Sequence, residues 1–431
     1  FYDADYDLYL YDISRKSKIY IRNIGHLIRK YGSVAGIVPF YEDIVIAFHT
    51  NGLMRLRTSK HYAEEVIDRN LRIFTVYNDP RQGVLWVGTD GQGVLKYSRV
   101  HSIARNLMLA DLSPNLSRPV RSILTDKHGN LWFGTKGDGL LCVKDYARTG
   151  KLSQVEIHAP DGSVQSASSY VKADREFQVC ALSESRYHNG FWVGTGAYGL
   201  CYYSFDDNSL HSIPTAGDRQ IADIHAIYEE SDSILYLATT AGFGKLTLEE
   251  GGHGIRRARY KPYHFFHQQE LTLFYDMLPG EDSLLWIGNR EKGLVRFNRR
   301  TEEYRVYTLS DILDKSVDDI LCLHRYRKDR LYVGTTSGLV CVSTEGETLQ
   351  ADYIGREQVL SNDMIHGILE DANGMLWLST NRGLVKFNPD NQLAHTYYYS
   401  GGVQVGEFCD DAYYRCPYTG KLFFGGVDGL V

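Results

Sequence analysis

Leu131-Trp132-Phe133-Gly134-Thr135 is one copy of a phrase that recurs along the whole chain. All five tryptophans of the sequence lie in copies of this phrase, and such regularity marks a repeat protein. Other copies carry tyrosine, phenylalanine or valine in place of the tryptophan. The anchor positions of the copies are Val45, Trp86, Trp132, Trp192, Tyr236, Trp286, Tyr332, Trp377 and Phe423.

Each copy lies in a unit of roughly 45 residues that contains four short strand-like stretches. An alternating stretch such as residues 120–126 leads through a polar turn into the phrase, and a glycine turn and two further stretches follow, as in residues 293–297 and 303–307. No part of the chain shows a long apolar period of 3.6 residues, so we expect few helices. The sequence therefore predicts an all-β fold built from four-stranded β-propeller blades.

The number of anchors predicts the domain organisation. The seven anchors from Trp132 to Phe423 complete one seven-bladed propeller, and Val45 and Trp86 belong to the last two to three blades of a preceding propeller. Residues 99–119 break the strand pattern, so we assign residues 1–112 to the first propeller and residues 113–431 to the second. A single ring of nine or ten blades is the alternative. We expect the chain to be part of a longer polypeptide.

The composition narrows the possible functions. The net charge is −6 and the isoelectric point is near 6.2, which disfavours a nucleic-acid-binding surface. No apolar run is long enough for a membrane span. The seven cysteines lack the spacing of metal ligands, so we predict neither a metal nor a cofactor. Cys409 and Cys416 could pair across a hairpin, and the sequence leaves that pairing open.

Two stretches resemble two-component regulator propeller repeats. They are Asp126-Lys-His-Gly-Asn-Leu-Trp-Phe-Gly-Thr-Lys-Gly-Asp-Gly-Leu140 and Asp371-Ala-Asn-Gly-Met-Leu-Trp-Leu-Ser-Thr-Asn-Arg-Gly-Leu-Val-Lys-Phe-Asn-Pro389. Residues 402–429 are similar to the last blade of the second propeller in hybrid two-component sensors. In that family two periplasmic seven-bladed propellers precede a membrane helix and a histidine kinase.

The resemblance implies a function for the chain. It implies the extracytoplasmic part of an inner-membrane sensor that detects oligosaccharides released from glycans and controls polysaccharide-utilisation genes. It also implies a homodimer, and no catalysis by this fragment, although the full-length protein would be a histidine kinase.

The candidate ligand site follows from blade geometry. The turn between the second and third strands of a blade opens on the same face as the loop that enters the first strand. Carbohydrate sites combine aromatic faces with convergent polar groups, and several cations favour an anionic sugar. His225 and His366 occupy matching positions and are expected to line a central channel. The candidate residues are Arg121, Lys136, Asp138, His225, Arg290, Lys292, His366, Arg382 and Glu407.

Two other function classes remain open from the residues alone. A carbohydrate-active enzyme would need paired carboxylates in the central funnel, for which Asp318, Glu407 and Asp410 are the available set. A protein-interaction scaffold would bind a partner chain on one face of the ring. Propellers support many functions, so the fold alone does not separate these classes.

Overall fold

The computed structural model describes residues 1–80, 84–98, 104–172, 176–216, 221–251, 254–344, 348–398 and 402–431. The chain forms two compact units, Phe1–His101 and Ser102–Val431. Strands dominate both units, and the predicted all-β propeller architecture is confirmed. In the described part of the chain, every helix is too short or too polar to cross a membrane.

The described residues of the first unit form one α-helix, a short 3-10 helix (Thr58–Lys60) and three small antiparallel sheets, ordered β1-β2, β3-β4-β5-β6 and β7-β8-β9. Val45 and Trp86, the two anchors of this unit, lie on the second strands of the two larger sheets. The elements are β1 (Asp7–Asp12), β2 (Ser17–Asn23), α1 (Gly25–Tyr31), β3 (Val34–Phe40), β4 (Asp43–Phe48), β5 (Gly52–Arg57), β6 (Ala63–Asp68), β7 (Ile73–Asp79), β8 (Val84–Thr89) and β9 (Val94–Ser98).

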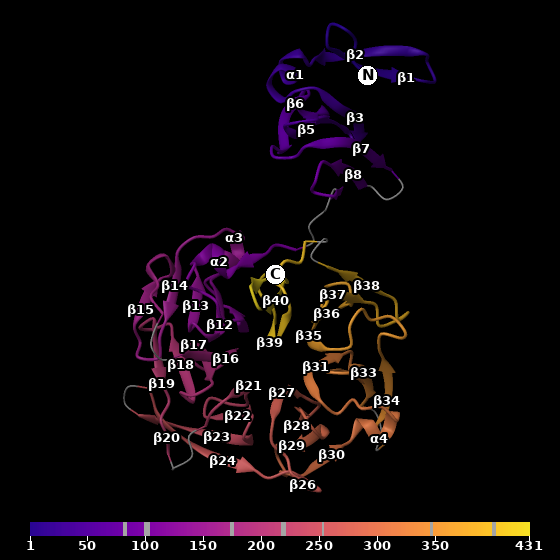
Figure 1. Cartoon of the computed structure of the whole chain (residues 1–431). Helices are drawn as coiled ribbons and strands as arrows, with labels where there is room; N and C mark the ends of the chain where they lie inside the picture. The colour runs from indigo at the N-terminus through magenta and orange to yellow at the C-terminus, as the bar shows by residue number, and fades with distance from the viewer. Residues whose placement is uncertain are drawn as a thin grey trace. The chain divides into compact units, whose positions relative to one another are not determined.

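The described strands of the second unit fall into seven successive antiparallel blades around a common centre (Figure 1). Blade 1 has β11 (Val120–Thr125), β12 (Leu131–Gly137), β13 (Leu140–Val143), β14 (Val155–His158) and an added β15 (Val164–Ser166). Blade 2 has β16 (Phe177–Glu184), β17 (Gly190–Thr195), β18 (Leu200–Ser204) and β19 (Ser209–Ser212). Blade 3 has β21 (Ile224–Glu229), β22 (Ile234–Thr239), β23 (Gly242–Gly251), β24 (Gly254–Tyr263) and an added β20 (Thr215–Ala216).

The remaining four blades follow the same order from the inner to the outer strand. Blade 4 has β27 (Phe274–Pro279), β28 (Leu284–Asn289), β29 (Gly293–Asn298) and β30 (Tyr304–Tyr307). Blade 5 has β31 (Ile320–Tyr326), β32 (Arg330–Thr335), β33 (Gly338–Ser343) and β34 (Gln350–Ile354). Blade 6 has β35 (Ile365–Glu370), β36 (Leu376–Thr380), β37 (Gly383–Phe387) and β38 (Ala394–Tyr397). Blade 7 has β39 (Phe408–Arg415), β40 (Leu422–Gly426), β41 (Gly429–Leu430) and β10 (Leu107–Met108).

Short elements lie between the blades of the second unit. The pairing of β12 with β16 joins the sheets of blades 1 and 2. The other elements are the hairpin strands β25 (Phe266–His267) and β26 (Gln269–Glu270) and the helices α2 (Leu109–Leu112), α3 (Tyr146–Thr149) and α4 (Leu309–Leu313).

The recurring phrase packs each blade against its neighbours. Asp126 accepts hydrogen bonds from the Trp132 indole at 2.8 Å and from the amides of His128 and Asn130 in the turn before it, so its carboxylate caps this turn. The glycine of the phrase leaves room for the next blade, because a Cβ on Gly134 would lie 2.4 Å from Val179. Gly425 of blade 7 leaves room for Val120 of blade 1 in the same way. This contact between the last and the first blade closes the ring.

The boundary between the units requires a correction. Leu107 pairs with Leu430 and Met108 with Gly429, so β10 is the outer strand of blade 7. We had assigned this stretch to the first propeller with a boundary after residue 112, but the division falls between His101 and Ser102. Residues 99–103 of the predicted linker lie outside the described residues. The strand was missed because Leu107 and Met108 are too short a pattern to recognise in sequence.

Cys409 and Cys416 do not form a disulfide, and both are free thiols. Cys416 is buried, and its sulfur lies 3.1 Å from the hydroxyl of Thr125 on β11. The pairing that the sequence left open is therefore absent from the structure.

Candidate functional site

A one-residue bulge recurs near the start of the first strand in six of the blades described. At each bulge the pairing register with the second strand skips one residue. A bulge redirects the side chain of the unpaired residue. The unpaired residues are Arg121, Cys180, His225, Tyr275, Leu321 and His366.

The corresponding bulge of blade 7 is larger. The pairing passes from Phe408 with Gly426 directly to Tyr413 with Phe424, so that residues 409–412 oppose Gly425 alone. Asp411 has a φ of 65°, in the left-handed region. We name this segment the β39 bulge (residues 409–412).

Asp411 connects the β39 bulge to blades 1 and 3. Its carboxylate lies 3.2 Å from the Arg121 guanidinium and 2.6 Å from Nδ1 of His225. The side chains of Asp411 and His225 are only 7% and 5% exposed. Since blade 3 lies across the ring from blade 7, Asp411 must lie near the ring axis.

Asp410 connects the β39 bulge to blades 6 and 4. Its carboxylate lies 2.6 Å from Nδ1 of His366 and 3.7 Å from the Arg290 guanidinium. Nε2 of His366 lies 2.6 Å from the side-chain oxygen of Asn381, so each ring nitrogen has a side-chain oxygen as its partner. Arg290 also forms an ion pair with Asp319. We name six residues the channel network: Arg121, His225, Arg290, His366, Asp410 and Asp411.

Tyr275 is enclosed by the channel network. Its ring stacks on His225 with centroids 3.9 Å apart, and the Arg290 guanidinium lies 4.7 Å from the same ring centre. The ring of Tyr275 is therefore already packed against two protein side chains in this conformation.

A second carboxylate contact joins blade 7 to blades 4 and 5 beneath the network. Asp276 accepts hydrogen bonds from the Tyr413 hydroxyl at 2.8 Å and from the Leu323 amide at 2.7 Å. Removal from water raises the pKa of the Asp276 carboxyl to about 7, although both hydrogen bonds act in the opposite direction.

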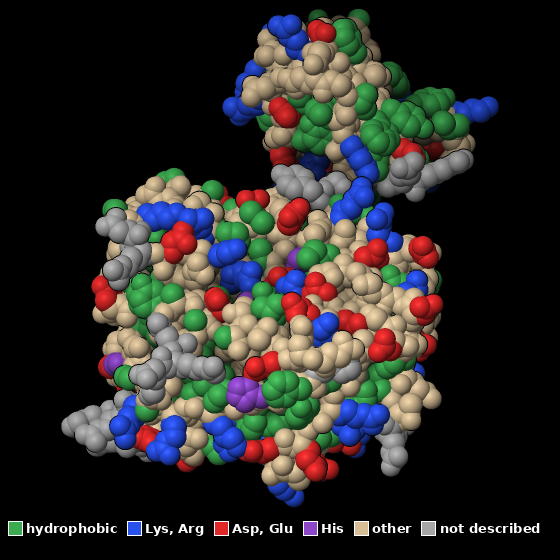
Figure 2. Space-filling view, turned by 60° about the horizontal axis from the view of Figure 1, so that its bottom comes forward, with side chains coloured by type: hydrophobic (Ala, Val, Ile, Leu, Met, Phe, Trp, Pro, Cys, Tyr) green, Lys and Arg blue, Asp and Glu red, His purple; other side chains and the backbone are tan. Residues whose placement is uncertain are grey.

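The charges of the network compensate one another. Burial opposes ionisation of Asp410, but the hydrogen bond from His366 and the charges of His366, Arg121 and Arg290 lower the pKa of this carboxyl. Burial likewise disfavours the charged form of Arg121, yet Asp411 and Asp410 raise the pKa of its guanidinium. Figure 2 shows basic and acidic side chains gathered around the middle of one face of the ring, with histidine between them.

Four of the predicted site residues, Arg121, His225, Arg290 and His366, are members of this network. A fifth, Lys136, lies exposed on β12 of blade 1. Burial raises the pKa of the Cys409 thiol to about 11, and the charges of Arg121 and Lys136 oppose this rise.

The other four predicted residues lie outside the network. Asp138 is buried and accepts hydrogen bonds from the amides of Ser117 and Arg118 at 2.8 Å, which is a structural role. The remaining three make no side-chain hydrogen bond or ion pair with the network in the described part of the chain. They are the half-buried Lys292 and the exposed Arg382 and Glu407.

The sequence interpretation missed one member of the network and three residues beside it. Asp411, Tyr275, Asp276 and Tyr413 were not predicted to contribute. A signal was present for Tyr275, because it precedes Trp286 by eleven residues, as Arg121 precedes Trp132. No comparable spacing identifies Asp411, which depends on the enlarged bulge. In the described residues, no group of three or more His, Cys, Asp or Glu is placed to hold a metal ion.

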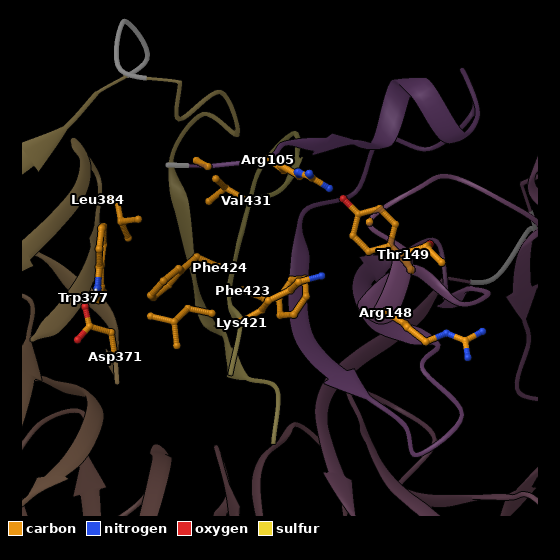
Figure 3. A pocket seen from close by; sticks show the side chains of 14 residues that line it. Arg105, Arg148, Thr149, Asp371, Trp377, Leu384, Lys421, Phe423, Phe424 and Val431 are labelled. Atoms are coloured by element: carbon orange, nitrogen blue, oxygen red, sulfur yellow. Dashed lines mark hydrogen bonds between the residues drawn. The ribbon is translucent and has the colours of Figure 1, made fainter. Parts of the chain in front are cut away.

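A separate cavity of about 610 Å³ lies between blades 6, 7 and 1 (Figure 3). Trp377, Leu384, Phe423, Phe424 and Val431 provide an apolar wall, as the figure shows. Three cations lie at its margin, namely Arg105, Arg148 and Lys421. Its aromatic lining makes this cavity the competing location for a sugar ligand.

Comparison with known proteins identifies the repeats. A family model described as two component regulator propeller matches residues 116–137 and 359–382. The chain contains two-component regulator propeller repeats. The first matched segment carries Arg121 and Lys136, and the second carries His366 and Arg382.

Solved structures with the same fold include extracellular domains of sensor systems. The extracellular domain of a putative hybrid two component system from B. thetaiotaomicron superposes with a TM-score of 0.66 at 20% identity, covering 99% of this chain and 53% of that chain. A second such domain from B. thetaiotaomicron gives a TM-score of 0.59 at 16% identity, covering 99% and 55%. At these identities the likeness shows the fold.

A curated relative is also similar in sequence. A protein named histidine kinase P4 from Formosa agariphila is 24% identical over 200 residues, which cover 35% of this chain and 14% of that protein. The chain therefore spans about half the length of the matched domains and a small part of this relative.

Proposed function

We propose that this chain is the ligand-sensing extracytoplasmic part of a hybrid two-component sensor. The two-component regulator propeller repeats, the fold shared with extracellular domains of such systems and the histidine kinase relative support this assignment. In the full-length protein, ligand binding in the periplasm would be signalled across the inner membrane to control polysaccharide-utilisation genes. The kinase activity would lie outside this fragment.

The proposed ligand is an oligosaccharide derived from a glycan, bound at the mouth of the central channel of the second unit. The observation that supports this location is the convergence of arginine and histidine side chains from blades 1, 3, 4 and 6 on Asp410 and Asp411. At such a site the guanidinium groups can donate hydrogen bonds to the hydroxyls of a sugar, and the carboxylates can accept hydrogen bonds from them. Predicted site residues outside the network would contribute only at the rim.

Calorimetry against a panel of glycan oligosaccharides tests the function and its location together. We expect one oligosaccharide to bind, and we expect Arg121→Ala and Lys136→Ala each to weaken it at least about tenfold, which corresponds to 1.4 kcal/mol. Arg300→Ala is the matched control, because Arg300 is exposed on an outer turn of blade 4. Unchanged affinity in both channel variants would exclude the channel mouth.

Tryptophan fluorescence separates the channel mouth from the competing cavity. Trp377 lines that cavity and donates its indole N–H to Asp371 at 3.0 Å. A ligand in the cavity should change Trp377 emission and should lose affinity in Lys421→Ala rather than in Arg121→Ala. A ligand at the channel mouth should show the reverse pattern.

The enzymatic alternative lacks a supporting contact in the described residues. The carboxylate of Asp318 accepts a hydrogen bond from the Ser310 amide, and Glu407 is exposed, so neither joins Asp410 in the network. Chromatography of the bound oligosaccharide after incubation tests the alternative directly, since cleavage would favour an enzyme. We also propose a homodimer, which sedimentation of the full-length sensor would test.

A further inference from the structure

The β39 bulge fills the centre of the ring with two adjacent carboxylates. Asp410 and Asp411 extend from one strand of blade 7 but contact side chains of blades 1, 3, 4 and 6. In a regular strand, adjacent side chains point to opposite faces. Both carboxylates reach the axis here because the register skips residues 409–412 and Asp411 is left-handed.

This conformation depends on the cations that surround it. Two neighbouring carboxylates repel each other when water is excluded, and the left-handed backbone conformation of Asp411 adds a smaller cost. Arg121, Arg290, His225 and His366 offset these costs by ion pairs and hydrogen bonds. The bulge is therefore expected to rearrange when its cationic partners bind another anion.

We propose that Asp410 and Asp411 act as an intramolecular anion at the channel mouth, and that a ligand carrying carboxylate or sulfate groups displaces them from Arg121 and Arg290. This proposal rests on the channel mouth being the ligand site, as proposed above. A guanidinium binds carboxylates and sulfates with the same paired N–H donors that it offers to aspartate. An external anion therefore has the chemistry to exchange with the bulge.

Displacement of the β39 bulge would also affect the strands of blade 7 that close the ring. The β39 bulge opposes Gly425 on β40, and Gly425 pairs with Leu430 on β41. Strand β41 pairs in turn with β10, which lies near the start of the second unit. Movement of the bulge would thus be transmitted to both ends of this unit through backbone hydrogen bonds.

Hydrogen exchange of the whole chain tests the displacement without any substitution. The probes are tri-galacturonate and inorganic sulfate, with neutral galactotriose and chloride at matched ionic strength as controls. We expect the anionic probes to increase amide exchange in residues 409–412, while the controls leave it unchanged. Binding of an anionic probe without faster exchange in the bulge would overturn the proposal.

Affinity measurements provide a second, independent test. The double variant Asp410→Asn/Asp411→Asn removes the competing anion and should bind tri-galacturonate about tenfold more tightly than the wild type. Asp319→Asn is the matched control, because it removes a carboxylate from Arg290 without altering the bulge. An equal gain in affinity in this control would indicate a general charge effect and refute displacement. If the double variant does not fold, the exchange measurement on the wild type decides.

The two proposals fail in different ways. If neither anionic probe binds the wild type or the double variant, the intramolecular anion is excluded. The proposed function survives that result if a neutral glycan binds and Arg121→Ala abolishes its binding. If no oligosaccharide of any class binds, the sensing proposal itself fails.

Discussion

Replacing Asp276 by asparagine should remove a pH dependence of stability that the wild-type chain carries. Asp276 lies beneath the channel network and accepts hydrogen bonds from Tyr413 and from the Leu323 amide. Its removal from water raises the pKa of this carboxyl from 3.8 to about 7. Asparagine keeps an oxygen that can accept hydrogen bonds but does not titrate.

The sign of the effect follows from proton binding. The unfolded chain releases the Asp276 proton near its ordinary pKa, whereas the folded chain keeps it until about pH 7. Between these values the folded state binds the extra proton, so the free energy of unfolding falls as the pH rises. A shift of about three units, at 1.36 kcal/mol per unit, gives a total loss of about 4 kcal/mol.

Urea unfolding at a series of pH values from about 4 to 8 measures this pH dependence of the free energy of unfolding. Trp286, on the strand paired with the Asp276 strand, supplies a fluorescence signal from the same blade. Asp390→Asn is the control, because the Asp390 side chain is 63% exposed. The wild type and Asp390→Asn should lose stability with rising pH more steeply than Asp276→Asn. Equal slopes in all three proteins would refute the assignment of a raised pKa to Asp276.

Three further variants test other parts of the ring by urea unfolding. Gly425→Ala should cost about 1–3 kcal/mol, because the new Cβ would lie 2.7 Å from Val120 at the closure of the ring. Asp126→Ala should cost about 2–4 kcal/mol, because the Trp132 indole and two turn amides lose their acceptor. Asp410→Asn should cost about 3 kcal/mol at neutral pH. Since the folded-state pKa of Asp410 is lowered, this last difference should shrink as the pH falls below the ordinary value, and a constant difference would contradict it.

The fold was predictable because its signal is local and repeated. Each copy of the phrase encodes a strand and a small residue at the contact with the next blade, which is glycine in most copies and alanine or serine in the others. Two copies also follow an aspartate that accepts the indole hydrogen bond. The domain boundary was less predictable, because β10 contributes only Leu107 and Met108 and is defined by its partner β41 in blade 7. A strand of two residues has no periodicity of its own.

The candidate site was predictable only in part, because blade geometry gives positions and not pairings. Blade geometry predicts Arg121 and Arg290 on one face of the ring as cations available to an anionic sugar, whereas the structure pairs them with Asp411 and Asp410. Their partners come from the β39 bulge, where strand alternation would send Asp410 and Asp411 to opposite faces. Only the enlarged bulge brings both carboxylates to the axis, and that register is set by contacts across the ring. A count of rim cations therefore overstates the positive charge that a ligand meets, unless the ligand first displaces the bulge.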